Sequence, residues 1–119
     1  MTTDHIAMPA AATVEDARNL LTSLPELPEN LSTIFLVDGM GRFAGSVPVA
    51  RLVIGSPKQK LGDLKAEPRL SVSAEAPERD AIEMVDKYNL LALPIVNEQD
   101  RLVGVVTVDD IVSVLRKKG

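Results

Sequence analysis

The residues with the clearest chemical potential in this sequence are Thr107 and Asp110, which follow the apolar run Leu102–Val106. A hydroxyl and a carboxylate three positions apart are typical of a helix start, because each side chain accepts a hydrogen bond from the other residue's backbone N–H. Unpaired N–H groups also point outward where a strand leads into a helix, and such a corner suits an anion or a ribose. Two interpretations are therefore open for this pair: a helix cap alone, or a helix cap that also contacts a ligand.

The composition excludes most catalytic chemistry. The 119-residue chain has no cysteine and one histidine, His5, which removes thiol nucleophiles, thiolate metal sites and most general-base arrangements. No pair of carboxylates suggests a division into acid and base. The turn Asp38–Arg42 contains two glycines, but it lies between two predicted strands and opens no helix, so we interpret it as a hairpin and not a phosphate loop. We expect no role for His5 and no enzymatic activity.

Charge and hydropathy narrow the class further. The net charge is −4 and only 3% of the residues are aromatic, which argues against nucleic-acid binding. No apolar stretch approaches the roughly 20 residues that cross a bilayer, and no signal peptide precedes residue 20. We therefore expect a cytoplasmic protein that binds no nucleic acid and does not insert into a membrane.

An internal repeat organises the chain around this corner. Ile34–Val47 aligns with Leu93–Val106 after a shift of about 59 positions, which also places Gly45 on Gly104. Upstream, the segments that begin at Thr13 and Pro77 align after a shift of about 64 positions. A longer loop in the first copy accounts for the difference between the two shifts.

Each copy is predicted to contain a short strand, an amphipathic helix, two strands joined by a tight turn, and a closing helix. The short strands are expected at Ile6–Met8 and Leu70–Val72, and the closing helices at Val49–Ile54 and Asp109–Lys117. About 60 residues form a marginal core alone. We therefore expect an α/β (α+β) fold in which two β-α-β-β-α repeats, residues 1–58 and 59–119, pack sheet against sheet about a pseudo-twofold axis.

This organisation resembles a tandem pair of cystathionine β-synthase (CBS) domains, or Bateman module. The resemblance is carried by the repeat, by Leu93–Val96, and by Gly104–Asp110, which matches the family pattern of glycine, an apolar residue, any residue, Ser or Thr, two further residues and Asp. More narrowly, the first four residues, Ser56–Asp63 and the Thr107–Asp110 segment are similar to the cytosolic pair of MgtE-type magnesium transporters.

The resemblance implies an adenine-nucleotide site in which Thr107 and Asp110 hold the ribose, with Leu93, Pro94 and Val72 beside it. AMP, ADP, ATP and S-adenosylmethionine are all compatible with such a corner. Pro94 has a second interpretation, as an edge or bulge feature of the sheet. The family also implies a homodimer through helix faces, for which Val112 and Leu115 are the exposed apolar candidates.

The first repeat departs from this pattern at the same corner. Pro48 and Arg51 stand where the second repeat has Thr107 and Asp110. Proline has no hydroxyl and arginine cannot accept a hydrogen bond from a ribose. We expect the first site to be lost or rebuilt for an anion, although Arg51 also suits a solvated helix position.

The metal chemistry of the MgtE-type pairs is also incomplete here. Their acidic residues hold Mg²⁺, which prefers charged oxygen ligands, whereas the matching positions are Arg79, Asn89 and Ser113. Asp109 and Asp110 remain as candidate Mg²⁺ ligands.

The expected function is that of a non-catalytic regulatory module, the cytosolic sensor fragment of an MgtE-like Mg²⁺ or other divalent-cation transporter. A parent transmembrane domain would then be its partner. Adenine nucleotide, Mg²⁺ or both would bind one arrangement of the pair better and shift the population toward it. The alternative is a ligand-free CBS pair that serves only as a structural dimerisation module.

Overall fold

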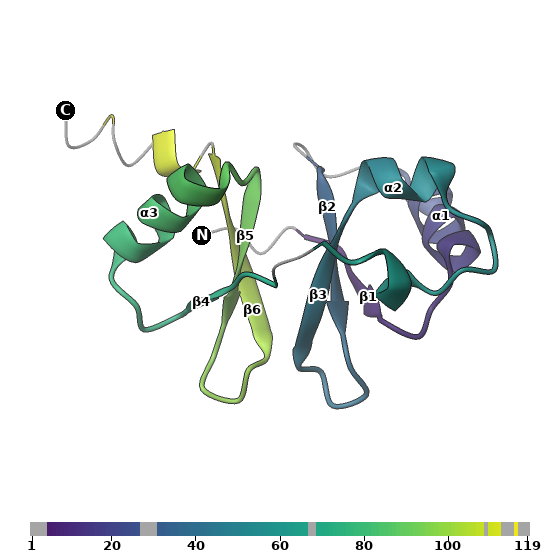
Figure 1. The fold of residues 1–119 in the computed structure, drawn as a ribbon, viewed down its shortest axis with the longest axis horizontal. Helices are drawn as coiled ribbons and strands as arrows, with labels where there is room; N and C mark the ends of the chain where they lie inside the picture. Colours follow the sequence, from purple (N-terminus) through teal and green to yellow (C-terminus); the bar gives the residue numbers. More distant parts are fainter. Residues whose placement is uncertain (1–4, 27–30, 67–68, 109, 113–115, 117–119) are drawn as a thin grey trace.

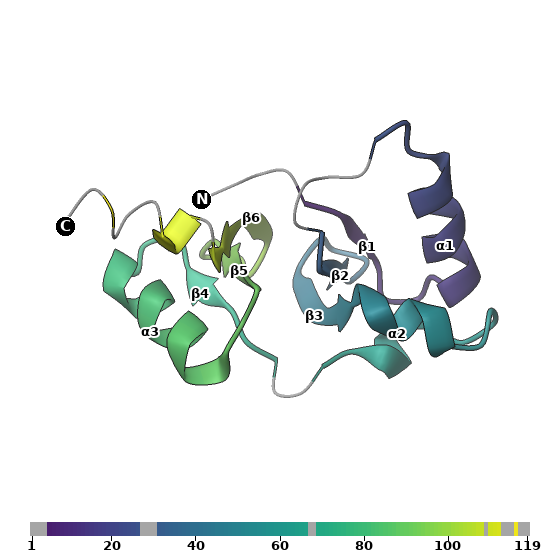
Figure 2. The same ribbon diagram turned by 90° about the horizontal axis from the view of Figure 1, so that it is seen from above.

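The computed structural model of the chain describes residues 5–26, 31–66, 69–108, 110–112 and 116. Two three-stranded sheets face each other, and the helices cover their outer sides (Figure 1). Seen from above, α1 and α2 lie at one end of the molecule and α3 lies at the other (Figure 2). The predicted mixed fold with sheet-to-sheet packing is therefore confirmed. No helix in the described ranges is long and apolar enough to cross a membrane.

The two sheets have the same topology. In each, a short first strand runs parallel to the central strand, which pairs antiparallel with the third. The first sheet contains β1 (Ala7–Pro9), β2 (Thr33–Val37) and β3 (Phe43–Pro48), and the second contains β4 (Val72–Ser73), β5 (Ala92–Val96) and β6 (Leu102–Thr107). The register shifts at matching places, between Leu36 and Val37 and between Ile95 and Val96.

The helices form where the sequence predicts them. They are α1 (Val14–Ser23), α2 (Val49–Ile54) and α3 (Glu78–Tyr88), with a 3₁₀ helix, η1, at Leu61–Leu64. Asn89 ends α3 in the left-handed conformation, which asparagine tolerates. The closing helix of the second repeat is described at Val108, residues 110–112 and Arg116, and the other residues predicted for it, Asp109, Ser113 and Leu115 among them, lie outside the described residues.

Three apolar clusters hold these layers together. One lies between the first sheet and its helices, and a second lies between the second sheet and α3. The third lies between the sheets and contains Phe35, Phe43, Val96 and Val105. Burial of this third cluster supplies the apolar area that neither small repeat has alone.

The segment between the repeats packs against the first of them. Leu61 of η1 is fully buried in the first repeat's core. The N–H groups of Val14 and Glu15, at the start of α1, donate to the carbonyls of Gln59 (2.9 Å) and Pro57 (3.0 Å). The segment thus covers the N-terminus of α1. The boundary at residues 58 and 59 remains a prediction.

Pro94 differs from its predicted place at an edge or in a bulge. It is buried within β5, the central strand, and the register shift falls after it. At the matching position in the first repeat, the N–H of Phe35 donates to the Ile6 carbonyl at 2.9 Å, and Ala7 pairs with Phe35. Proline has no N–H to donate, and in the second sheet the corresponding pairing begins one residue later, at Ile95. A shortened first strand is how the sheet accommodates a central proline.

Candidate functional site: the strand-to-helix corner of the second repeat

Thr107 and Asp110 form the reciprocal pair that the sequence predicts. The Thr107 N–H donates to Asp110 Oδ2 at 3.0 Å, and the Asp110 N–H donates to Thr107 Oγ1 at 3.2 Å. Both residues are half-buried at the end of β6. The helix-cap interpretation is therefore confirmed, and the question that remains is whether the same groups also meet a ligand.

The cap leaves hydrogen-bonding capacity at this corner. Asp110 uses Oδ2 for the cap, and no described residue donates to Oδ1. The Thr107 hydroxyl accepts one bond through Oγ1 and keeps its own proton for donation. A ribose has two adjacent hydroxyls. One could donate a hydrogen bond to the free carboxylate oxygen of Asp110 while the other accepts one from the Thr107 hydroxyl.

An identical cap elsewhere in the chain provides an internal comparison. At the start of α1, the Thr13 N–H donates to Asp16 Oδ2 at 3.0 Å, and the Asp16 N–H donates to Thr13 Oγ1 at 3.2 Å. There, however, the N–H groups of the two following residues already donate to the connecting segment, as described above. The cap at Thr13 has the same side-chain geometry, and it differs in that the connecting segment covers the backbone N–H groups beside it.

The other predicted site residues lie in the strands behind the corner. Thr107 pairs with Ala92, the first residue of β5. The next two residues of β5, Leu93 and Pro94, pair with Val106 and Val105. Leu93 is fully buried on the helix side of the sheet. Pro94 alternates with it and therefore occupies the face toward the other sheet. The structure thus places Pro94, and not Leu93, on the face between the repeats.

Val72 lies farther from the corner. It pairs with Ile95 in the first strand of the sheet and belongs to the same core cluster as Leu93. Its side chain is 9% exposed. Val72 and Leu93 contribute mainly to the core in this structure, and their contact with a ligand remains a prediction.

The matching corner of the first repeat is built differently. Pro48 precedes α2 and provides no side-chain cap. Arg51 Nη1 donates to the Leu64 carbonyl at 2.7 Å, so this arginine holds the connecting segment against α2. The backbone hydrogen bond at the start of the helix is the same in both repeats. The Val49 N–H donates to the Ser32 carbonyl, and the Val108 N–H donates to the Leu91 carbonyl. The hydroxyl and the carboxylate of the second corner are thus replaced by a proline and by an arginine in a structural contact.

The metal site proposed for Asp109 and Asp110 remains a prediction. Among the residues that the structure covers, no group of three or more His, Cys, Asp or Glu side chains comes together as a metal site. Asp110 is described and uses one carboxylate oxygen for the cap, whereas Asp109 lies outside the described residues. Arg79 and Asn89 lie on and after α3 and supply no carboxylate.

One contact near the junction of the repeats was not predicted. Arg69 Nη1 donates to the Phe43 carbonyl at 3.3 Å, and the guanidinium carbon lies 5.9 Å from the centroid of the Phe43 ring. No periodicity or motif marks Arg69, because the contact depends on the path of the chain between the sheets.

Residues 61–117 match the family model of the CBS domain, and nearly the whole chain has the fold of a tandem pair of CBS domains. Among proteins of known role, the magnesium transporter MgtE of Bacillus subtilis is 31% identical over 115 residues, which are 97% of this chain and 26% of the transporter. The MgtE of Thermus thermophilus is 29% identical over the same share of the chain. The chain therefore spans about a quarter of the length of these relatives.

Two solved structures have the same fold over nearly the whole chain. The soluble part of a magnesium transporter superposes with a TM-score of 0.88 at 26% identity, covering 98% of this chain and 46% of that one. The cytosolic domain of the Mg²⁺ channel MgtE in complex with ATP superposes with a TM-score of 0.86 at 30% identity, covering 96% and 46%.

Proposed function

We propose that this chain is the regulatory, non-catalytic CBS pair of an MgtE-like magnesium transporter, that it lies on the cytosolic side of the membrane, and that it binds an adenine nucleotide at the corner formed by Thr107 and Asp110. The observation that carries the proposal is the spare hydrogen-bonding capacity of this capping pair. The similar MgtE domain whose structure contains ATP supports the choice of ligand class.

In this proposal the Asp110 carboxylate accepts hydrogen bonds from the ribose, and the Thr107 hydroxyl donates a further bond. Hydrogen bonds to a charged group contribute about 1.5–3 kcal/mol each. Pro94 lies on the face of the sheet that points toward the other repeat. The binding energy shifts the arrangement of the repeats only to the extent that the nucleotide prefers one arrangement.

The proposal predicts one nucleotide per chain. The first-repeat corner has proline at the hydroxyl position, and its arginine is engaged with the Leu64 carbonyl. A second nucleotide bound with similar affinity would contradict this assignment.

Mg²⁺ enters the proposal in two ways that experiment separates. It either accompanies the nucleotide phosphates or binds directly to Asp109 and Asp110. Direct binding has weak support, since two adjacent carboxylates supply few of the oxygen ligands that Mg²⁺ needs.

Thermal unfolding in the presence of ligands tests the function directly. A ligand at about 100 times its dissociation constant stabilises the folded state by about 2.7 kcal/mol, which raises the Tm of a domain of this size by about 5 °C or more. AMP, ADP, ATP and S-adenosylmethionine are each measured with and without Mg²⁺. We expect at least one nucleotide to raise the Tm of the wild type. This rise should disappear in Asp110→Ala and persist in Asp16→Ala, which removes the matching cap of α1.

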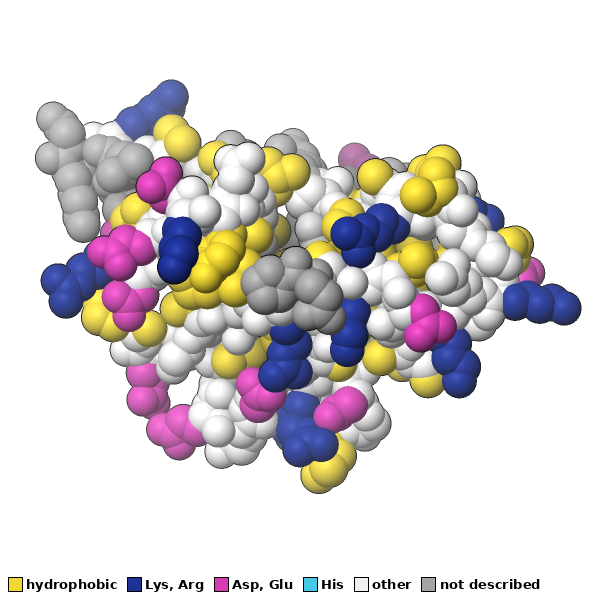
Figure 3. Space-filling model, in the orientation of Figure 1, with side chains coloured by type: hydrophobic (Ala, Val, Ile, Leu, Met, Phe, Trp, Pro, Cys, Tyr) yellow, Lys and Arg dark blue, Asp and Glu magenta, His cyan; other side chains and the backbone are white. Residues whose placement is uncertain are grey.

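A structural dimerisation module is the second candidate, favoured by the exposed apolar side chains of α2. Val53 is 77% exposed and Ile54 is 85% exposed, and Figure 3 shows hydrophobic side chains on the surface over this helix. Val112 of the closing helix is 40% exposed, whereas Leu115 lies outside the described residues. A second copy of the chain would cover these side chains.

Sedimentation tests the dimer, and together with the thermal data it separates the two candidates. Dimerisation through α2 predicts a dimer at tens of micromolar that becomes a monomer in Ile54→Asp. A monomeric wild-type chain would contradict the dimer, and dimerisation without any nucleotide-dependent rise in Tm would favour the purely structural module.

A further inference from the structure

The two repeats are joined by hydrogen bonds at one end only, among bonds whose partners are both described. Between residues 5–66 and residues 69–116, the Phe43 N–H donates to the Asp100 carbonyl at 2.8 Å, and Arg69 donates to the Phe43 carbonyl. Arg42 and Arg101 add an isolated antiparallel bridge. Phe43 follows the turn of the first hairpin and Asp100 lies in the turn of the second, whereas Thr107 ends β6 at the other end of its sheet. Figure 1 shows both hairpin turns at the same end of the molecule.

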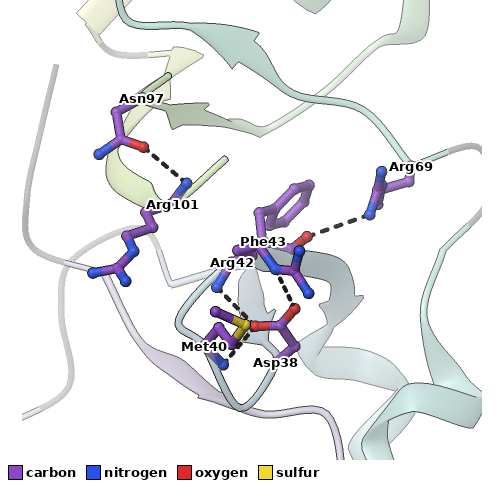
Figure 4. A network of polar contacts seen from close by, with 7 residues as sticks. All are labelled: Asp38, Met40, Arg42, Phe43, Arg69, Asn97 and Arg101. Carbon is purple, nitrogen blue, oxygen red and sulfur yellow. Dashed lines mark hydrogen bonds and ion pairs between the residues drawn. The ribbon is translucent and has the colours of Figure 1, made fainter. Parts of the chain in front are cut away.

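Phe43 is the centre of this junction. Its N–H bonds to the second repeat's hairpin, its carbonyl bonds to Arg69, and its ring is buried between the sheets with Val96 and Val105. The Arg69 guanidinium lies over the ring within the usual distance of a cation–π contact. Figure 4 shows Arg69 reaching Phe43 from one side while Arg101 lies on the other. Three different interactions thus hold one residue to both repeats.

We propose that the end of the molecule where the two hairpins turn, held together by the contact of Arg69 with Phe43, is a fixed pivot about which the two repeats change their arrangement. The six residues of β6 span roughly 20 Å between this pivot and Thr107. A small rotation at the pivot therefore becomes a large displacement at the corner. A ligand at Thr107 and Asp110 would act where the motion is greatest, and this part of the inference rests on the proposed function.

Distances between pairs of spin labels test the pivot. The chain has no cysteine, so two introduced cysteines carry both labels. Met40→Cys with Gln99→Cys reports the hairpin end, and Ser32→Cys with Leu91→Cys reports the corner end, just before β2 and β5. Each labelled chain is diluted with unlabelled protein so that distances within one chain dominate.

The pivot predicts a narrow distance distribution for the hairpin pair and a broader one for the corner pair, without any nucleotide. Arg69→Gln is expected to broaden the hairpin distribution, whereas Arg79→Gln, which removes an exposed arginine from α3, leaves it unchanged. Equal widths at the two ends, or a hairpin distribution unaltered by Arg69→Gln, would overturn the inference.

Addition of ATP then separates this inference from the proposed function. If both hold, ATP shifts or narrows the corner distribution and leaves the hairpin distribution in place. A shift of the hairpin pair as large as that of the corner pair would overturn the pivot. If ATP raises the Tm but alters neither pair, the nucleotide binds without shifting the arrangement of the repeats, and that regulatory step is contradicted, while the ligand-free widths and the effect of Arg69→Gln still decide the pivot.

Discussion

Arg42 and Arg101 form an antiparallel bridge with each other, although they belong to different hairpins, in which they occupy the same position. Two equivalent residues that face each other mark the pseudo-twofold axis of the pair. Their side chains have different surroundings: Arg42 Nε donates to Asp38 Oδ2 at 2.8 Å, whereas the residue that matches Asp38 is the neutral Asn97 (Figure 4). The hairpins therefore share a backbone and differ in charge.

The left-handed position of each hairpin gives a stability prediction. Gly41 has φ +80° and its equivalent, Asp100, has φ +64°. A residue with a Cβ is strained there, by roughly 1 kcal/mol. We expect Asp100→Gly to raise the free energy of unfolding by up to about 1 kcal/mol and Gly41→Ala to lower it by about the same amount. Urea titration measures both, and destabilisation by Asp100→Gly would contradict the account.

Asp38 gives a prediction for pH. Hydrogen bonds from the backbone N–H groups of Arg42 and Met40, together with the Arg42 side chain, lower the pKa of Asp38 from its usual value of 3.8. A carboxyl whose pKa is lowered on folding contributes stability that is fully present above the unfolded pKa and is lost as pH falls through the folded pKa. We expect the difference in Tm between the wild type and Asp38→Asn to shrink as pH falls below about 4.

The second hairpin is the control for this pH effect. Asn97 accepts the same backbone bonds, from Gln99 and Arg101 at 3.0 Å each. Asn97→Asp is expected to introduce a similar acid-dependent loss of stability. If the difference between the wild type and Asp38→Asn stayed constant from neutral pH to pH 2, the assignment of the lowered pKa would be wrong.

Leu93 and Leu91 separate core packing from ligand contact. Leu93 is fully buried and Leu91 is 66% exposed. Truncation of a buried leucine to alanine costs about 2–5 kcal/mol, and surface changes usually stay within about 0.5 kcal/mol. We expect Leu93→Ala to lower the unfolding free energy strongly and Leu91→Ala to leave it nearly unchanged. If Leu93→Ala kept the full unfolding free energy and lost only nucleotide affinity, Leu93 would contact the ligand and would not belong to the hydrophobic core.

Much of this architecture follows from local sequence. The capping pairs at Thr13 and Thr107 involve residues three apart, so spacing alone predicts them. The bounds predicted for α2, Val49–Ile54, are those observed. The internal repeat predicts two sheets with the same topology, because equivalent segments fold alike.

Features that depend on tertiary context were predicted less well. A proline inside a strand favours an edge position, yet Pro94 lies in a central strand because the neighbouring first strand pairs with fewer residues. The contact of Arg69 with Phe43 depends on where the chain crosses between the sheets. The corner itself was identified from the sequence, but the covering of the equivalent cap at Thr13 by residues 57–59 became visible only in the fold.

The central claim is that the Asp110 carboxylate binds a nucleotide in addition to capping a helix. Titration calorimetry with ATP on the wild type, Asp110→Ala and Asp16→Ala tests it most directly, because the two variants remove the same cap at about the same cost in stability, about 1 kcal/mol. We expect one ATP per chain, a loss of about ten- to a hundredfold in affinity for Asp110→Ala, and unchanged affinity for Asp16→Ala. Equal affinity in all three proteins, or no binding to any of them, would contradict the account and leave Thr107 and Asp110 as a helix cap alone.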